Sequence, residues 1–168
     1  MNRVKELLQQ RGMEVFDLSK FWKKRSNYTI LTEQLAEFIS QARFEKAVLI
    51  PDSPDSGFEM SIIANKFPGV RAVLCSNAKQ VQKARANLDA NVLIMGQRYT
   101  PESEIPLMLN RFLNTKYTQV RSRQRRFIEQ LSRIEAERHR ASIIKSKEEA
   151  LREVLTPDLA ISDLDYTL

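Results

Sequence analysis

The 168-residue sequence has one cysteine, one histidine and four glycines, and it contains no long apolar run. The single cysteine, Cys75, excludes an internal disulfide and suits a reducing cytoplasm, where we expect this chain to work. No stretch approaches the roughly 18 apolar residues of a membrane-spanning helix, and the first residues do not resemble a signal peptide, so no membrane partner is expected. Because Cys75 ends an apolar segment, we interpret it as a buried structural thiol rather than a nucleophile.

Positive charge is in excess, with 27 Lys and Arg against 21 Asp and Glu and a net charge of +6. A basic run could contact nucleic acid or phosphate groups. Glutamates are interspersed, however, and no aromatic residues are interleaved to stack on bases. We therefore favour a solvated helix face and regard nucleic-acid binding as the weaker alternative. The run consists of Arg121, Arg123, Arg125, Arg126, Arg133, Arg138, Arg140, Lys145 and Lys147.

Three apolar segments, at residues 46–51, 70–75 and 91–96, organise the chain. Each is followed by a polar turn and a helical pattern, which is typical of a parallel sheet buried on both faces. We predict an α/β fold, with a Rossmann-like, three-layer parallel sheet of four to five strands and a long C-terminal helix. Ligands bind at the carboxyl ends of such strands. A site is therefore expected on the loops 51–58, 75–78 and 96–101.

Three parts of the chain are expected: an α/β domain (1–118), a basic helix (119–156) and a strand-like tail (157–168). The long helix would measure about 50 Å at 1.5 Å per residue. A helix of that length exceeds a small domain, so we expect it to pack on a partner chain in a homodimer or heteromer. The alternating residues 13–18 predict an edge strand, and 19–29 predict a loop. Further helices are predicted at residues 2–11, 30–43, 59–66, 78–88 and 102–117.

Several ordered motifs carry a resemblance to a known family. The segments Met60-Ser-Ile-Ile-Ala-Asn-Lys66, Pro68-Gly-Val-Arg-Ala-Val-Leu-Cys75, Arg85-Ala-Asn-Leu-Asp-Ala-Asn-Val-Leu93 and Gly96-Gln-Arg98 resemble the ribose-5-phosphate isomerase type B and galactose-6-phosphate isomerase family. The resemblance runs from about residue 4 to residue 135. It implies a five-stranded Rossmann-like sheet, usually a dimer, that takes a phosphorylated sugar in carbohydrate metabolism, with no cofactor or metal. It also implies aldose–ketose interconversion through an enediolate, which needs a base, a ring opener, oxyanion donors and arginines.

The catalytic positions of that family are altered in this sequence. The resemblance places the base cysteine at Pro54, which cannot take a proton, and replaces two turn glycines by Asp55 and Glu59. The ring-opening histidine falls on Asn87. A later Gly-Gly-Arg-His motif appears as Arg121-Ser-Arg-Gln124, which keeps the arginine but not the histidine. The chain's one histidine, at position 139, lies in the long helix and does not align with these roles.

The residues that the resemblance leaves for a site are Glu59 as a speculative base, and Arg98, Arg123, Ser56, Gly57 and Asn87 for binding substrate and phosphate. The alternative for Glu59 is an exposed carboxylate at a helix N-terminus. Two functions stay open. One is a family isomerase that binds a phosphosugar with impaired catalysis. The other is a non-catalytic structural or regulatory subunit that acts through its long basic helix.

The family's central first strand has no counterpart here, because the chain starts in the helix that follows it. An empty slot would leave buried backbone groups unpaired, which is costly. We hypothesise that the tail segment Leu159–Asp163 fills the slot, in its own chain or in a partner. An alternative is that Asp163-Leu-Asp165-Tyr-Thr167 resembles the first motif of haloacid-dehalogenase-type phosphatases, whose first aspartate is a phosphoryl nucleophile. The tail would then begin a truncated further domain.

Overall fold

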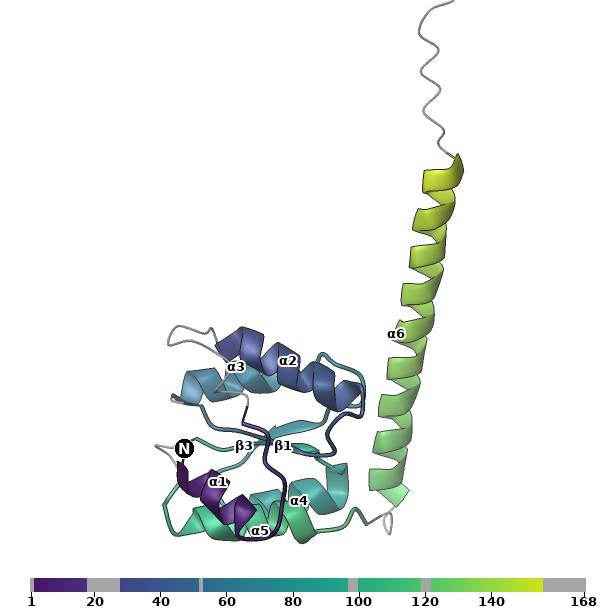
Figure 1. Ribbon diagram of the computed structural model, residues 1–168. Coiled ribbons are helices and arrows are strands. Elements are labelled where there is room, and N and C mark those ends of the chain that lie inside the picture. Colours follow the sequence, from purple (N-terminus) through teal and green to yellow (C-terminus); the bar gives the residue numbers. More distant parts are fainter. Residues whose placement is uncertain (1, 18–27, 52, 97–99, 119–121, 156–168) are drawn as a thin grey trace, which may run out of the picture. The chain divides into compact units, whose positions relative to one another are not determined.

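The computed structural model describes residues 2–17, 28–51, 53–96, 100–118 and 122–155 (Figure 1). They fall into two compact units, divided between Glu129 and Gln130. The first unit is an α/β domain, and the second contains most of a long helix. The predicted fold class, α/β with a parallel sheet and a long C-terminal helix, is confirmed. The predicted tail strand lies outside the described residues.

Among the described residues the sheet has three parallel strands, where four to five were predicted, in the order β1-β3-β2: β1 (Ala47–Leu49), β2 (Ala72–Leu74) and β3 (Val92–Ile94). Ala47 and Ala72 both lie opposite Val92, so the three strands are in register. Every residue of β3 is fully buried, because β3 has a strand on each side and helices on both faces. The three apolar segments seen in the sequence thus form the sheet that they predict.

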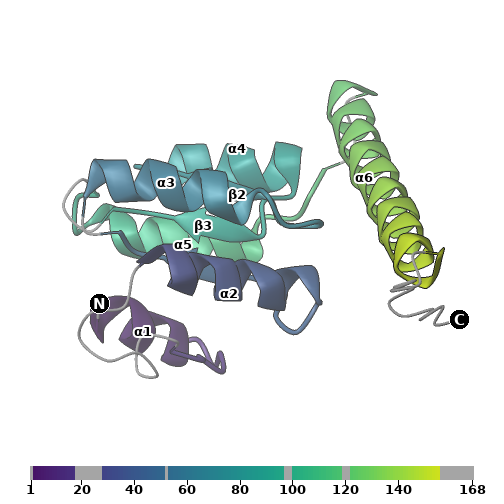
Figure 2. The ribbon, with the colours of Figure 1, turned by 90° about the horizontal axis from the view of Figure 1, so that it is seen from above.

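Helices cover both faces of the sheet (Figure 1). On one face lie α2 (Tyr28–Ser40) and α3 (Pro54–Ala64), side by side when seen from above (Figure 2). On the other lie α1 (Asn2–Gln9), α4 (Ala78–Leu88) and α5 (Glu104–Asn114). Side chains alternate along a strand. Val92 and Ile94 therefore pack with α2 and α3, whereas Leu93 packs with α1, α4 and α5.

Helix α3 begins at Pro54, so the prediction of a helix over 59–66 after a loop over 51–58 was wrong at this boundary. The Ser53 hydroxyl accepts a hydrogen bond from the Ser56 N–H at 3.1 Å, and the Ser56 hydroxyl accepts one from the Ser53 N–H at 3.1 Å. This reciprocal capping box starts a helix, and proline suits the first position, which needs no N–H donor. The turn after β1 is therefore short.

Residues 13–17 do not form the predicted edge strand. Gly12 has a φ of +72° at the turn after α1, a conformation that glycine adopts without strain. The segment Met13–Asp17 then runs beside β1 without a ladder to any described strand. An apolar groove lined by both segments lies between them, so neither reaches the other's backbone. This open groove is the physical reason for the wrong prediction.

Helix α6 (Ser122–Leu155) has 34 residues and, through residue 150, largely exposed side chains. Its charges alternate in sign along the helix, giving ion pairs one turn apart: Arg125 with Glu129, Arg133 with Glu137 and Lys145 with Glu149. Because the side chains of these pairs are solvent-exposed, the pairs contribute little to stability. They agree with the interpretation of the basic run as a solvated helix face. In the described part of the chain, no helix has the length and apolar character needed to cross a membrane.

Candidate functional site

A cavity of about 300 Å³ lies at the carboxyl ends of the three strands, where the sequence predicts a site. Parallel strands bring the loops that follow them to one edge of the sheet, so three segments far apart in sequence meet here. The loops after β1, β2 and β3 and the first turns of α3 and α4 line it: Pro51, Ser53, Pro54, Gly57, Phe58, Leu74, Cys75, Ser76, Gln80, Gly96 and Thr100.

The start of α3 forms one wall of the cavity. Gly57 belongs to this wall, and a Cβ atom there would lie 3.3 Å from both Leu74 Cδ1 and Pro51 Cγ. Glycine therefore lets α3 pack closely against the ends of β1 and β2. Ser56 is buried, and its hydroxyl also donates to the Ser53 carbonyl at 2.9 Å, so it holds the turn rather than lining the cavity.

The start of α4 forms a second wall, and the N–H groups of Ser76, Ala78 and Gln80 already have acceptors. The Ser76 N–H donates to Gln80 Oε1 at 2.8 Å, and the Asn77 side chain accepts from the Gln80 N–H at 3.0 Å. The Ala78 N–H donates to a carboxylate oxygen of Glu104 at 2.9 Å. Glu104 thus supplies the negative charge that a helix N-terminus favours. The N-terminus of α4 therefore attracts an anionic ligand less strongly.

The lining offers hydroxyl and amide groups for hydrogen bonding, from Ser53, Ser76, Gln80 and Thr100. Thr100 is 6% exposed, and its hydroxyl has no hydrogen-bond partner among the described residues. A buried hydroxyl without a partner is costly, which suggests that a ligand supplies one.

The lining has little acid–base capacity. Its one titratable side chain among the described residues is Cys75, and burial raises the pKa of this thiol to about 11. A thiol with that pKa stays protonated near neutral pH. The part of the chain that the structure describes also holds no group of histidine, cysteine and acidic residues suited to a metal ion. What the arrangement can do chemically is bind a polar ligand through neutral donors and acceptors.

The residues proposed from the sequence lie at different places. Gly57 lines the cavity and Ser56 supports its wall. Glu59 is exposed on α3, outside the lining, and accepts a hydrogen bond from the Tyr28 hydroxyl. Arg98 lies outside the described residues, in the loop between the lining residues 96 and 100. The cavity also contains polar groups that sequence reasoning missed, notably Gln80 and Thr100, although their positions just after predicted strands were a usable signal.

Asn87 and Arg123 are not in the cavity lining. Asn87 lies on α4, and its side-chain oxygen accepts a hydrogen bond from the Gln124 amide at 3.2 Å. Arg123 is exposed in the first turn of α6. The structure therefore brings Asn87 close to the start of α6, in the neighbourhood of Arg123.

Comparisons with known proteins agree on one family. A family model described as Ribose/Galactose Isomerase matches residues 1–131. Ribose-5-phosphate isomerase B of Escherichia coli (strain K12) is 32% identical over 132 residues, which cover 79% of this chain and 85% of that protein. The galactose-6-phosphate isomerase subunit LacB of Clostridium acetobutylicum is 28% identical over 122 residues, which cover 73% of this chain and 69% of that protein.

Solved structures give the same result. Ribose-5-phosphate isomerase B from Mycoplasma genitalium, with bound ribulose-5-phosphate, superposes with a TM-score of 0.70 and 25% identity, covering 81% of this chain and 88% of that one. The type B ribose 5-phosphate isomerase of Trypanosoma cruzi has a TM-score of 0.61 and 34% identity, with coverage of 68% and 73%.

Proposed function

Because the chain belongs to the ribose/galactose isomerase family, we propose that its cavity binds a phosphorylated pentose or hexose. The observation that carries this proposal is the cavity itself, which opens at the carboxyl edge of the sheet and holds the Thr100 hydroxyl, for which the described residues supply no hydrogen-bond partner. Sugar hydroxyls are both donors and acceptors, so they match the serine, threonine and glutamine side chains of the lining. The Mycoplasma genitalium relative, which binds ribulose-5-phosphate, supports the choice of ligand class.

An arginine is the proposed phosphate ligand. Arg98, which lies outside the described residues, stands in the sequence between Gly96 and Thr100, and these two line the cavity. Arg123, the other arginine predicted from the sequence, is exposed in the first turn of α6 and lies outside the cavity lining, so Arg98 is the candidate for this cavity. A guanidinium binds phosphate through two parallel hydrogen bonds, which fixes orientation as well as adding affinity.

We propose further that isomerisation is impaired. The reaction requires a base that removes a proton next to the carbonyl carbon, and such a base works best with a pKa near the operating pH. Among the described lining residues the one candidate is Cys75, whose pKa of about 11 keeps the thiol protonated. Glu59, the speculative base, hydrogen bonds with Tyr28 outside the lining. We therefore expect tight positioning of the sugar with little proton transfer.

Proton exchange at sugar C-2 separates binding from catalysis. Ribose 5-phosphate, and then a hexose 6-phosphate, would be incubated with the protein in heavy water and followed by NMR, while melting temperature reports binding. We expect a raised melting temperature without exchange. Exchange that disappears in Glu59→Gln would contradict the impairment and assign the base to that glutamate. Neither exchange nor a shifted melting temperature would contradict the binding proposal as well.

A matched pair of arginine variants tests the phosphate contact. Arg98→Ala should abolish the ligand-induced rise in melting temperature, because it removes a charge-assisted contact worth about 1.5–3 kcal/mol. Arg138→Ala removes the same charge from an exposed position on α6 and should leave the rise unchanged. Equal effects of the two variants would point to non-specific charge attraction instead, which added salt would suppress.

A second candidate function is that of a structural or regulatory subunit acting through α6. The observation in its favour is that four large apolar side chains on this helix are 40–57% exposed: Phe127, Ile134, Ile143 and Ile144. Most helix stability in proteins comes from packing of an apolar face. We propose that α6 packs in a homodimer or heteromer. Light scattering should then show a dimer that Ile143→Ser with Ile144→Ser dissociates and Ala141→Ser does not.

A further inference from the structure

We propose that a groove beside β1 binds residues 157–168 of this chain as an additional strand of the sheet. The groove shares no lining residue with the cavity at the carboxyl ends of the strands, so the proposal is independent of the proposed function. In this proposal the C-terminal tail, which lies outside the described residues, pairs with the edge of β1 that faces away from β3.

Strand β1 has one paired edge and one open edge. On the paired edge, the Ala47 N–H donates to the Asn91 carbonyl at 2.9 Å, and the Leu49 carbonyl accepts from the Met95 N–H at 3.0 Å. Peptide groups alternate in direction along a strand, so the N–H and C=O of Val48 point the other way. Among the described strands, only β3 pairs with β1. Val48 thus presents a hydrogen-bond donor and an acceptor to the groove.

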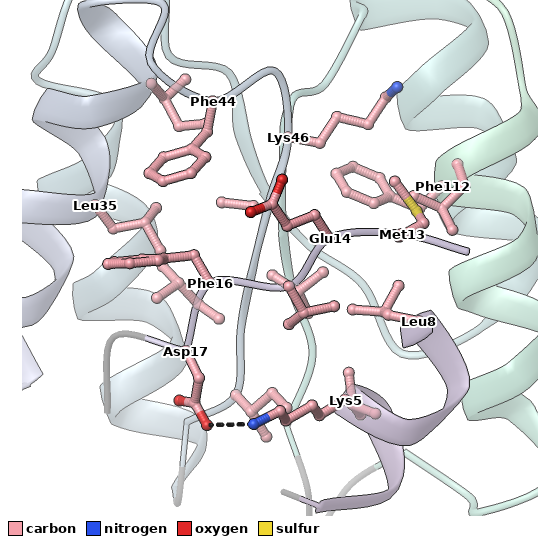
Figure 3. A pocket seen from close by; sticks show the side chains of 18 of the residues that line it. Lys5, Leu8, Met13, Glu14, Phe16, Asp17, Leu35, Phe44, Lys46 and Phe112 are labelled. Atoms are coloured by element: carbon pink, nitrogen blue, oxygen red, sulfur yellow. Dashed lines mark ion pairs between the residues drawn. The ribbon is translucent and has the colours of Figure 1, made fainter. Parts of the chain in front are cut away.

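The groove extends the sheet layer past β1 (Figure 3). Residues 46–50 line one side and residues 13–17 the other. Side chains of the helices close it above and below, including Leu35 from α2, Leu8 from α1 and Phe112 from α5. A segment lying here would have apolar neighbours on both faces and strand backbone at its edge, which is the environment of an inner strand of a parallel sheet.

The groove leaves apolar surface uncovered. Met13, Phe16 and Phe44 line it and are 41%, 54% and 38% exposed. The rings of Phe16 and Phe44 stack with centroids 5.7 Å apart, so they form one continuous patch at its mouth. Open strand edges with apolar surroundings bind extended segments readily. The groove has a volume of about 270 Å³.

The tail is the part of this chain that fits the groove. Only two segments outside the described residues are long enough to supply a strand, namely 18–27 and 156–168. Residues 18–27 carry several lysines and an arginine, and both their ends are fixed, by Asp17 and Tyr28. The tail contains consecutive apolar residues at Leu159, Ala160 and Ile161, followed by a small serine. Consecutive apolar residues are what a strand buried on both faces requires.

The groove has a lysine at each end, and Glu14 and Asp17 also line it. Lys46 lies at one end and Lys5 at the other, where Lys5 pairs with Asp17 at 3.8 Å (Figure 3). The apolar run of the tail lies between Asp158 and Asp163. The two aspartates are five residues apart, about 17 Å in a strand at 3.3 Å per residue. An aspartate therefore flanks the apolar run of the tail on each side, as a lysine flanks the groove at each end.

Hydrogen exchange of single backbone amides tests the proposal in the full chain. The Val48 amide should be protected, and Ile161→Asp should increase its exchange rate about 100-fold, as expected for an opened edge. Ala47 and Leu49 serve as internal references, because their peptide groups face β3. Thr167→Asp adds the same charge outside the apolar run and should leave Val48 protected. Rapid exchange of Val48 in the unaltered chain, or protection that survives Ile161→Asp, would overturn the proposal.

A photo-cross-linker identifies the occupant if Ile161→Asp unfolds the whole domain. p-Benzoylphenylalanine placed at position 16, at the mouth of the groove, should cross-link to a peptide from residues 157–168, detected by mass spectrometry. Mixing chains of two isotopic compositions shows whether the tail belongs to the same chain or to a second copy, and either result supports the proposal. Cross-links only to other segments, or none at all, would overturn it.

Discussion

The Gln124 side chain donates a hydrogen bond to the Asn87 side chain, with 3.2 Å between Nε2 and Oδ1. Next to it, the N–H and hydroxyl of Thr118 both donate to the Ala86 carbonyl, at 2.9 and 3.0 Å. These bonds join the chain before α6, and its first turn, to α4. At positions 87 and 124 the family resemblance expects histidines. In this chain, two amides that cannot exchange protons near neutral pH hold the start of α6 instead.

Removing the Gln124 amide should destabilise the domain modestly. Gln124→Ala leaves the half-buried oxygen of Asn87 without its donor, which costs about 1 kcal/mol of the free energy of unfolding. Urea denaturation measures the loss. Gln130→Ala makes the same truncation at an exposed position of α6 and should change stability by less than about 0.5 kcal/mol. Equal losses in both variants would mean that the Asn87 contact contributes nothing.

Two buried threonines should respond oppositely to valine. Thr100 has no partner for its hydroxyl among the described residues, so Thr100→Val should stabilise the free protein by about 1 kcal/mol and weaken phosphosugar binding. Thr32 is equally buried, but its hydroxyl donates to the Tyr28 carbonyl at 2.7 Å, so Thr32→Val should destabilise by a similar amount. Calorimetry with and without ribose 5-phosphate checks both. A destabilised Thr100→Val variant would show that its hydroxyl has a protein partner.

Cys75 makes stability depend on alkaline pH. Burial raises the pKa of its thiol from 9.0 to about 11, so as the pH rises the unfolded chain loses this proton first. The stabilisation of the folded state by this protonated thiol is complete below about pH 9. It is lost as the pH rises through 11, and the loss in the free energy of unfolding is at most about 3 kcal/mol. Unfolding measured between pH 8 and 11 should show a steeper decline for the unaltered chain than for Cys75→Ala. Parallel curves would rule out this effect of burial.

Gly57→Ala should lower the affinity for a phosphosugar more than it lowers the free energy of unfolding. The alanine Cβ would lie 3.3 Å from both Leu74 Cδ1 and Pro51 Cγ, and Leu74 is 37% exposed whereas Pro51 is buried. The higher helix propensity of alanine, up to about 1 kcal/mol, offsets this crowding. We expect phosphosugar affinity to fall about tenfold, or 1.4 kcal/mol, because the new methyl group narrows the cavity. Ser61→Ala lies on the same helix outside the lining and should bind normally in the same titration calorimetry.

The sequence was sufficient to predict the three described strands, and a cavity lies at the edge of the sheet where it predicts a site. Each of the three apolar segments was bounded by turns, and their parallel arrangement followed from the helices between them. The cavity then followed from topology, because the carboxyl ends of parallel strands meet at one edge. Local patterns carry this information, so no contact between distant residues had to be known.

Other features depended on contacts that no local pattern encodes. The start of α3 was misplaced because Ser53 and Pro54 were interpreted as a loop, although serine before proline also marks a helix start. Residues 13–17 alternate like a strand but have no described strand to pair with. The bond between Asn87 and Gln124 joins residues 37 apart in sequence. Such a pairing becomes visible only once α4 and the chain before α6 are placed together.

The order β1-β3-β2 also determines when the sheet can assemble during synthesis. Both outer strands are made before the central strand, and they do not pair with each other. Until Val92–Ile94 leaves the ribosome, β1 and β2 each lack the strand with which they pair. At about 5–20 residues per second this interval lasts seconds for β1. Nascent chains halted before residue 92 should therefore bind chaperones that hold extended apolar segments more strongly than chains halted well beyond it.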